Sequence, residues 1–344
     1  MTSPDPSVAR KPPRRLGLYG PFIALGLAVA VWAFVWLSLT ATLERRLNDL
    51  RGQPAASGSR PDWRSLTVTG FPFRIDVDFT GAAWRDASGF QVAAPILKTE
   101  AFAWAPDHWV ASAPGGVTVT RPGKGALIVT AKVLRASLFQ ATAHPPRFSL
   151  EGLGLTFTPG PGADAFFVQS AAELHLHTRA GPDNQGAFYV ELDKAAARPD
   201  GVLGSVAAGK PLTLNADAIY SRADAFTGAT WADSVRAWSD AGGRLDVRRL
   251  LIQPGAASLD ARGGGLTVDA DGRLKGSLVA TLIQAPRVLT VMADKGKVSP
   301  QALAGALLVL AARGAGPTVP ITLGFQAGRT LVGPVALGPA PKVY

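Results

Sequence analysis

The chain contains no cysteine and few charged residues, and both shortages narrow what it can be. Without cysteine, its 344 residues cannot form disulfide bridges, a thiolate metal site or a cysteine nucleophile. Charged residues make up 17% of the chain, whereas an average soluble domain has roughly 25%. The net charge is +10, but the excess is dispersed rather than gathered in basic runs interleaved with aromatic residues. Nucleic-acid binding is therefore not expected.

Sequence motifs that carry catalysis are missing as well. Neither a P-loop nor the G-x-S-x-G serine elbow occurs. His175 and His177 have the spacing of a metal-binding pair, but only Glu173 extends the row, so we interpret them as the polar face of a strand. The run 269–272 resembles the start of a calcium loop, yet the later glutamate is missing and a hairpin turn explains it. We expect no enzyme activity, no catalytic residue, no cofactor and no bound metal.

One long apolar run stands near the N-terminus. Residues 16–39 carry no charge over 24 positions, and a helix of that length crosses the roughly 30 Å hydrocarbon core of a bilayer. Trp32 and Trp36 lie near its far end, where aromatic rings settle at the membrane interface. We predict an uncleaved transmembrane helix over 16–39. A cleaved signal peptide is the alternative, but the run is too long for one and Ser38-Leu39-Thr40 is a poor cleavage site.

The residues that flank this run set the predicted topology. Four basic residues precede it: Arg10, Lys11, Arg14 and Arg15. By the positive-inside rule, residues 1–15 form a cytoplasmic tail and the rest of the chain lies across the membrane. Leu43, Leu47 and Leu50 continue the helical period, so residues 40–62 are predicted to be a helical extension ending at Gly52, followed by a short linker.

From residue 63 onward the hydrophobic pattern changes to the alternation that is typical of strands. Phe73, Ile75, Val77 and Phe79 alternate with polar residues, which predicts a half-buried strand. Its apolar face would meet either a protein core or a ligand. These four residues are therefore the candidate apolar ligand face of the chain.

The same alternation recurs along the chain and is punctuated by turns. Segment 266–282 predicts a hairpin with a two-residue turn at Asp271-Gly272. A change of phase at Arg248-Arg249 predicts a β-bulge. The 38 glycines and 27 prolines thus fit turns and linkers between strands of an antiparallel sheet.

Only two short helices are predicted after the N-terminal one. Trp231, Val235 and Trp238 mark an amphipathic helix that begins near Thr230 and ends before Gly242-Gly243. Ser299-Pro300 has the form of a helix start, and an apolar helix would follow to Arg313. The predicted fold is mainly β. One N-terminal transmembrane helix precedes a curved, largely antiparallel β-sheet domain over 63–344 with a few short helices.

Three segments resemble a known bacterial family, the domain of unknown function 2125 family. They are WRSLTVTGFPFRIDVDFTGAAW (63–84), the hairpins of 237–282, and VPITLGFQAGRTLVGPVALGPAP (319–341). The Gly-Phe-Pro-Phe-Arg segment, which follows an N-terminal anchor, and the Gly-Pro-Val-Ala-Leu-Gly-Pro segment are the specific features, and the middle of the chain is less so. The middle of the chain is also similar to the wider AsmA-like envelope proteins. That resemblance implies a β-rich groove and a link to lipid movement or outer-membrane assembly, and it supplies no catalytic residue.

These observations lead to one expected function and two alternatives. We expect a non-enzymatic protein anchored in the bacterial inner membrane through residues 16–39, with its bulk in the periplasm, that handles lipid or assists envelope assembly through an apolar sheet face. An interaction module that binds other envelope proteins through its sheet is the first alternative. An envelope hydrolase is the second, and the missing motifs argue against it.

Overall fold

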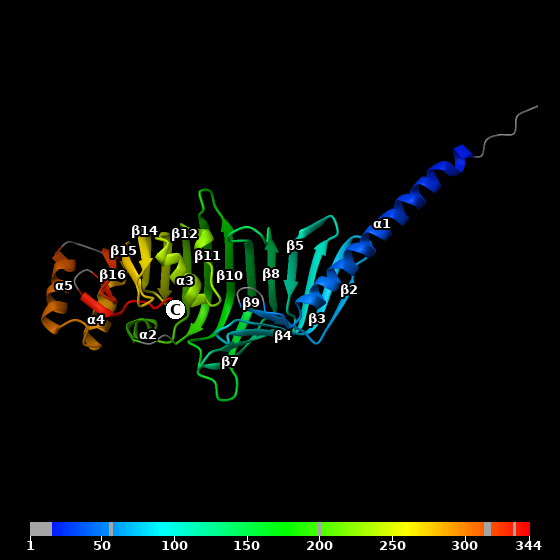
Figure 1. Cartoon of the computed structure of the whole chain (residues 1–344). Coiled ribbons are helices and arrows are strands. Elements are labelled where there is room, and N and C mark those ends of the chain that lie inside the picture. The colour runs from blue at the N-terminus through cyan, green and yellow to red at the C-terminus, as the bar shows by residue number, and fades with distance from the viewer. Residues whose placement is uncertain (1–15, 55–57, 199–200, 313–317, 333–334) are drawn as a thin grey trace, which may run out of the picture.

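The computed structural model of the chain shows one long, curved sheet from which an N-terminal helix projects (Figure 1). The structure describes residues 16–54, 58–198, 201–312, 318–332 and 335–344. All strand pairings among them are antiparallel, and they join 18 strands into a single sheet. The prediction of a mainly β fold with one N-terminal apolar helix and few short helices is confirmed. The predicted cytoplasmic tail, 1–15, lies outside the described residues.

The sheet begins with the strands nearest the N-terminal helix. β1 (Arg60–Asp62) and β2 (Ser65–Thr69) pair with different halves of β3 (Arg74–Arg85). On its other side β3 pairs along its whole length with β4 (Gln91–Phe102). This end of the sheet is therefore built around one long hairpin, β3–β4.

Between β4 and β9 the sheet divides into two branches. β5 (Ala105–Ser112) and β8 (Val133–Phe139) connect residues 98–102 of β4 to residues 147–153 of β9 (Arg147–Pro159). β6 (Val117–Arg121) and β7 (Gly125–Thr130) connect residues 91–93 of β4 to residues 156–159 of β9. The two branches rejoin on β9, so the apolar face of the sheet is continuous through both.

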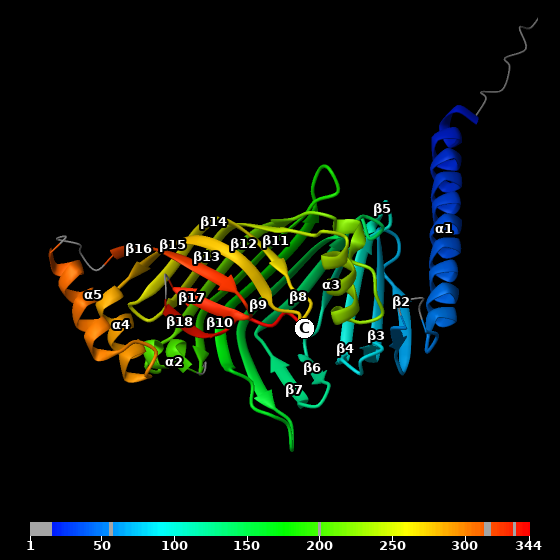
Figure 2. The ribbon, with the colours of Figure 1, turned by 60° about the vertical axis from the view of Figure 1, so that its left-hand side comes forward.

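From β9 onward each strand pairs with the next one along the chain. The order is β10 (Val168–Ala180), β11 (Gly186–Ala197), β12 (Leu212–Tyr220), β13 (Leu245–Pro254), β14 (Ser258–Val268), β15 (Leu274–Ile283), β16 (Thr318–Gln326), β17 (Arg329–Val332) and β18 (Val335–Pro339). After β18 the chain crosses back to the β14–β15 turn, where the Val343 amide donates to the Gly272 carbonyl at 2.7 Å. The last strands thus curl over the end of the sheet (Figure 2).

Helix α1 (Leu16–Leu50) docks onto the sheet through one stripe of its surface. The stripe repeats every three or four residues: Trp32, Trp36, Thr40, Leu43 and Leu47. Trp32 Nε1 donates to the Pro72 carbonyl and Trp36 Nε1 to the Arg74 carbonyl, each at 2.9 Å. These bonds tie the helix to the segment that leads into β3.

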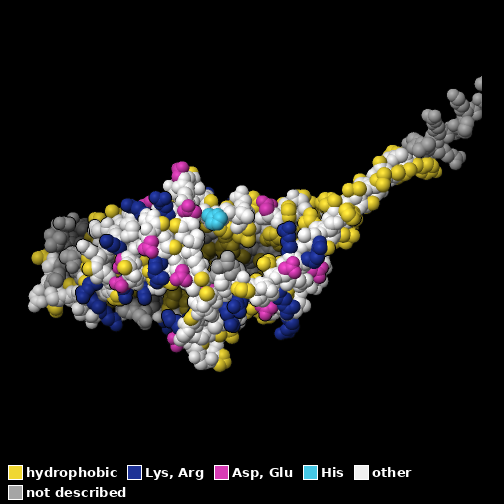
Figure 3. All heavy atoms as spheres, in the orientation of Figure 1, with side chains coloured by type: hydrophobic (Ala, Val, Ile, Leu, Met, Phe, Trp, Pro, Cys, Tyr) yellow, Lys and Arg dark blue, Asp and Glu magenta, His cyan; other side chains and the backbone are white. Residues whose placement is uncertain are grey.

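The preceding part of α1 is exposed over residues 21–31. Phe22, Leu25, Leu27 and Val29 are each more than half exposed, and hydrophobic atoms cover this part of the helix in Figure 3. Among the described residues, α1 is the one helix long and apolar enough to cross a membrane. The helix also continues past residue 39 to Leu50, as the leucine spacing predicts.

The register of the strands gives the sheet one apolar face and one polar face. Directly paired residues in an antiparallel sheet project to the same side. One chain of such pairs, which we call the apolar row, crosses β3, β4, β5 and β8 to β16: Val77, Thr99, Ala111, Ala136, Leu150, Leu176, Val190, Ala216, Leu250, Ala261, Ala280 and Ile321.

The neighbouring chain of pairs, which we call the polar row, faces the other way. It runs through Asp78, Lys98, Ser112, Arg135, Glu151, His175, Glu191, Asn215, Leu251, Asp260, Thr281 and Pro320. Alternation of side chains along each strand therefore separates apolar from polar surface over the same twelve strands.

The helices lie against the apolar face. α1 covers it near β3, and the short helix α3 (Trp231–Asp240) packs Val235 and Trp238 against Val268 of β14. At the far end, α2 (Gly201–Ala207), α4 (Ala285–Asp294) and α5 (Pro300–Ala312) form a group beside β13–β16. A 3₁₀ turn (Ala223–Ala225) precedes α3.

Several local predictions are confirmed and one is corrected. α3 begins after Thr230, whose side chain accepts from the Asp233 amide, as the amphipathic pattern predicts. The bulge lies at Arg248. The β14–β15 turn is longer than the predicted two residues: Asp269 and Arg273 close it, and the Asp269 carboxylate accepts from two backbone amides within it. The predicted end of α5 at Arg313 falls outside the described residues.

The two faces of β15 predict different costs of truncation. Leu278 is 1% exposed on the apolar face, whereas its neighbour Val279 is 67% exposed on the other. We expect Leu278→Ala to lower the free energy of unfolding by about 2–5 kcal/mol, because it leaves a cavity in the core. Val279→Ala is the matched control and should change it by less than about 0.5 kcal/mol. Equal losses in denaturant unfolding of the two variants would contradict the assignment of faces.

Candidate functional site

The four residues of the predicted ligand face lie in two different environments. Ile75 and Val77 are 1% exposed and Phe79 is 9% exposed, whereas Phe73 is 61% exposed. Leu43 and Leu47 of α1 pack on the buried three. The open face expected on this strand is therefore closed at Ile75, Val77 and Phe79, because the helical extension of α1 lies across it. Phe73 precedes β3, which begins at Arg74, and projects from the turn.

The open part of the apolar face lies further along the sheet. In the apolar row, Ala136, Leu150, Leu176, Val190 and Ala216 are only half-buried, although they lie in the middle of the sheet. Figure 3 shows hydrophobic side chains lining a hollow in the middle of the molecule. The helices at the two ends of the sheet thus cover the ends of the apolar face and α3 lies over part of it, while the central row residues stay only half-buried.

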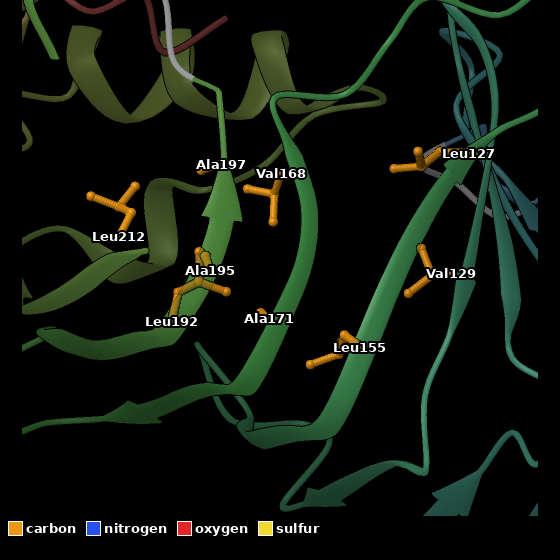
Figure 4. Close-up of a cluster of buried hydrophobic side chains, with 9 residues drawn as sticks. All are labelled: Leu127, Val129, Leu155, Val168, Ala171, Leu192, Ala195, Ala197 and Leu212. Atoms are coloured by element: carbon orange, nitrogen blue, oxygen red, sulfur yellow. The ribbon is translucent and has the colours of Figure 1, made fainter. Parts of the chain in front are cut away.

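A tightly packed cluster borders the accessible centre of the apolar face, which we call the open floor. Leu155, Ala171, Leu192, Ala195 and their neighbours from β7, β9, β10, β11 and β12 form a buried cluster (Figure 4). Leu155 is 2% exposed and Ala195 is fully buried. The apolar face is therefore tightly packed beside its open centre.

A cavity of about 500 Å³, the distal cavity, lies between the far-end helices and the sheet. Its walls include Val206 of α2, Val288 and Met292 of α4, and Leu282 and Ile321 of the sheet. Among its described lining residues, Ser258 is the one polar side chain. The volume falls within the roughly 300–1,000 Å³ of small-ligand pockets.

A second cavity, the α3 cavity, has a volume of about 580 Å³ and lies under α3. Leu176, Phe188, Tyr220, Leu245 and Trp238 line it. The indole of Trp238 donates to the Ser221 carbonyl at 2.7 Å, so its polar atom is satisfied. Because Leu176 and Ile321 both belong to the apolar row, the row connects this cavity with the distal one.

Tyr220 is the one ionisable side chain among the described residues that line either cavity. Burial raises the pKa of its phenol to about 12, because an apolar surrounding disfavours the phenolate. Phe226 meets its ring edge-on with centroids 5.3 Å apart. The cavities can hold apolar groups but offer no acid–base pair.

His175 and His177 lie on the polar face of the sheet, opposite the apolar row. His177 Nδ1 is 2.9 Å from Ser149 Oγ, and His175 Nε2 is 3.3 Å from a carboxylate oxygen of Glu173. Within the described residues no group of three or more metal-ligating side chains is found. The pair is thus placed where the alternation of β10 predicts, on the polar side of the strand.

Comparison with known proteins assigns the chain to a family. Residues 36–341 match a family of uncharacterized proteins conserved in bacteria, DUF2125. The chain belongs to this family. No curated protein and no solved structure matches the chain. The region matched by the DUF2125 family starts at Trp36, in the docking stripe of α1, and includes every strand of the sheet.

Most of the apolar face of this DUF2125 protein is not predictable from its sequence, because alanine is common in it. Ala111, Ala136, Ala216 and Ala261 contribute little contrast to an alternation of apolar and polar residues. Strands β4, β5 and β8 were not predicted for the same reason, and Pro95 and Pro106 interrupt two of them. Ala111-Ser112-Ala113 and Ala216-Asp217-Ala218 have the two-residue spacing of a strand, but their place in one row becomes visible only once strand register is known.

Tyr220 predicts a pH dependence of folding. Its pKa is about 12 in the fold and 10.0 in the reference state, so the folded state binds the proton more tightly. Stability is therefore fully present below about pH 10 and is lost as pH rises toward about 12. We expect Tyr220→Phe to lose less stability than the wild type between about pH 9 and pH 11.5 in denaturant unfolding. Equal losses in both proteins would contradict the burial of this phenol.

Proposed function

We propose that this DUF2125 protein handles lipid in the bacterial envelope by holding acyl chains against its open apolar face. The observation that carries the proposal is the apolar row, which crosses twelve strands with Thr99 as its one polar residue. At about 4.8 Å per strand, the row is roughly 50 Å long. The row is buried toward its ends, whereas its half-buried centre, from Ala136 to Ala216, is an apolar surface that a ligand could cover.

The chemistry of the face supports an acyl chain as this ligand. Each methylene removed from water contributes about 0.8 kcal/mol. Ser258 is the one polar side chain among the described residues of the distal cavity, and in the α3 cavity the Thr178 and Thr267 hydroxyls donate to backbone carbonyls. The Thr99 hydroxyl donates to the Val77 carbonyl at 3.0 Å, so the one polar side chain of the row already has a hydrogen-bond partner within the protein. A long, flexible hydrocarbon therefore fits better than a polar metabolite.

The position of α1 supports a membrane-anchored arrangement. We propose that residues 16–39 span the inner membrane with residues 1–15 in the cytoplasm and the sheet in the periplasm. The role proposed is non-enzymatic, since Tyr220 alone is ionisable among the described residues that line the distal cavity and the α3 cavity. AsmA-like grooves are the analogy for lipid movement, and binding of other envelope proteins remains the competing use of the same face.

Photocrosslinking on one strand separates these two uses. Leu176 and His175 are neighbours on β10 that face opposite sides. We expect Leu176→p-benzoylphenylalanine in the full chain, irradiated in cells, to yield phospholipid adducts in mass spectrometry. His175→p-benzoylphenylalanine is the matched control and should yield none. A single protein adduct at Leu176 without lipid would instead establish the interaction module.

A charge on the floor of the face predicts loss of lipid without loss of fold. Leu150 lies in the apolar row, whereas Leu153 of the same strand lies on the other face and is 39% exposed. We expect Leu150→Lys to abolish copurifying phospholipid, because a chain covering it would bury an unpaired ammonium. Leu153→Lys should retain the lipid, and both variants should unfold at similar temperatures. Retention of lipid by Leu150→Lys would overturn the assignment of this face.

A further inference from the structure

Four exposed aromatic side chains gather where α1 leaves the sheet, and we call them the aromatic tip. Phe71 and Phe73 come from the β2–β3 turn, Phe102 is the last residue of β4, and Trp104 lies in the β4–β5 turn. Each is more than half exposed. The rings of Phe102 and Trp104 stack with centroids 4.9 Å apart, and Phe73 meets Trp104 edge-on at 6.3 Å. Phe73, Trp104 and Phe102 thus form one contiguous aromatic surface, and Phe71 lies against Trp36 of α1.

The aromatic tip is fixed to a defined height on α1. Trp36 meets Phe71 edge-on with centroids 5.3 Å apart and donates its indole N–H to the Arg74 carbonyl. A helix that enters the hydrocarbon at Leu16 rises about 30 Å by Trp36, at about 1.5 Å per residue. That distance equals the thickness of the hydrocarbon core. In a protein anchored through α1, the tip would therefore stand at the membrane boundary and not in bulk water.

Charged residues begin directly behind the tip. Arg74 forms ion pairs with Asp76 at 2.8 Å and with Glu100 at 3.1 Å. Arg74 is paired with Phe102, and Asp76 with Glu100, across β3 and β4. The surface thus changes from aromatic to charged within two residues of the same hairpin, as expected where hydrocarbon gives way to headgroups.

We propose that the aromatic tip inserts into the outer leaflet of the membrane beside α1 and forms a second membrane contact. Aromatic rings are most stable in the interfacial region, and in water the four rings would leave an exposed apolar patch. The contact would hold the near end of the sheet against the leaflet, so that an acyl chain could reach the apolar face without crossing water. This inference rests on the proposed membrane anchor, not on lipid in the groove.

Fluorescent labelling tests the insertion directly. Because the chain has no cysteine, each variant Phe73→Cys and Trp104→Cys takes one environment-sensitive NBD label. The full-length protein is reconstituted into phosphatidylethanolamine–phosphatidylglycerol vesicles with brominated acyl chains. We expect both labels to show blue-shifted emission and to be quenched by the bromines.

Two further labels serve as controls. Val29→Cys lies on the exposed part of α1 and should be quenched, whereas Val279→Cys lies on the polar face of β15 and should not. Quenching at Val29→Cys without quenching at the tip would overturn the proposal, as would blue-shifted but unquenched tip labels, which indicate a protein contact. Quenching at all four positions would also overturn it, since that indicates general adsorption.

The outcome of this labelling experiment does not depend on whether lipid binds to the apolar face. If the tip labels are quenched while Leu176→p-benzoylphenylalanine gives no lipid adduct, the tip contact stands and the lipid-handling function falls. If lipid adducts form but the tip labels stay unquenched, the function stands and the second contact falls.

Discussion

Neighbouring strands of an antiparallel sheet keep their side chains in step only while the register is held, because a slip of one residue exchanges the two faces. In this molecule that register is kept from β3 to β16, and the apolar row results. Long strands keep it by local bulges, such as the one between Ala261 and Gly264 of β14. Gly264 has φ +136°, and a Cβ there would come within 2.3 Å of the Ser277 carbonyl oxygen. Only glycine permits this close approach of the two strands.

The strand register produces the apolar face, and the helices cover parts of it. α1 lies over Ile75 and Val77, α3 packs on Val268, and α2 and α4 lie beside Leu282 and Ile321. An ordinary sandwich would place a second layer across the whole face. Here the centre lacks that layer within the described residues, which is why the same surface serves as a core at both ends and as an open floor between them.

The sequence predicted the parts of this structure that depend on local pattern. The alternation of 73–79, the hairpin of 266–282 and the α3 stripe were all visible, because each contrasts large apolar with polar side chains. Burial of Ile75 and Val77 was not predictable, since it depends on helical residues about 30 positions away. Likewise, the continuity of the apolar face depends on Ala136 and Ala216 being aligned across strands. Alternation alone identifies a face but not what covers it.

The docking stripe of α1 also bears on how the sheet is presented. Many anchored domains hang from a flexible linker and sample a wide cone of orientations. Here the helix is uninterrupted from Leu16 to Leu50, and it is fastened at Pro72 and Arg74 before it ends. In a membrane-anchored protein such a joint couples the azimuth of the helix to the long axis of the sheet. The far end of the sheet, with α4 and α5, would then keep a nearly constant distance from the bilayer.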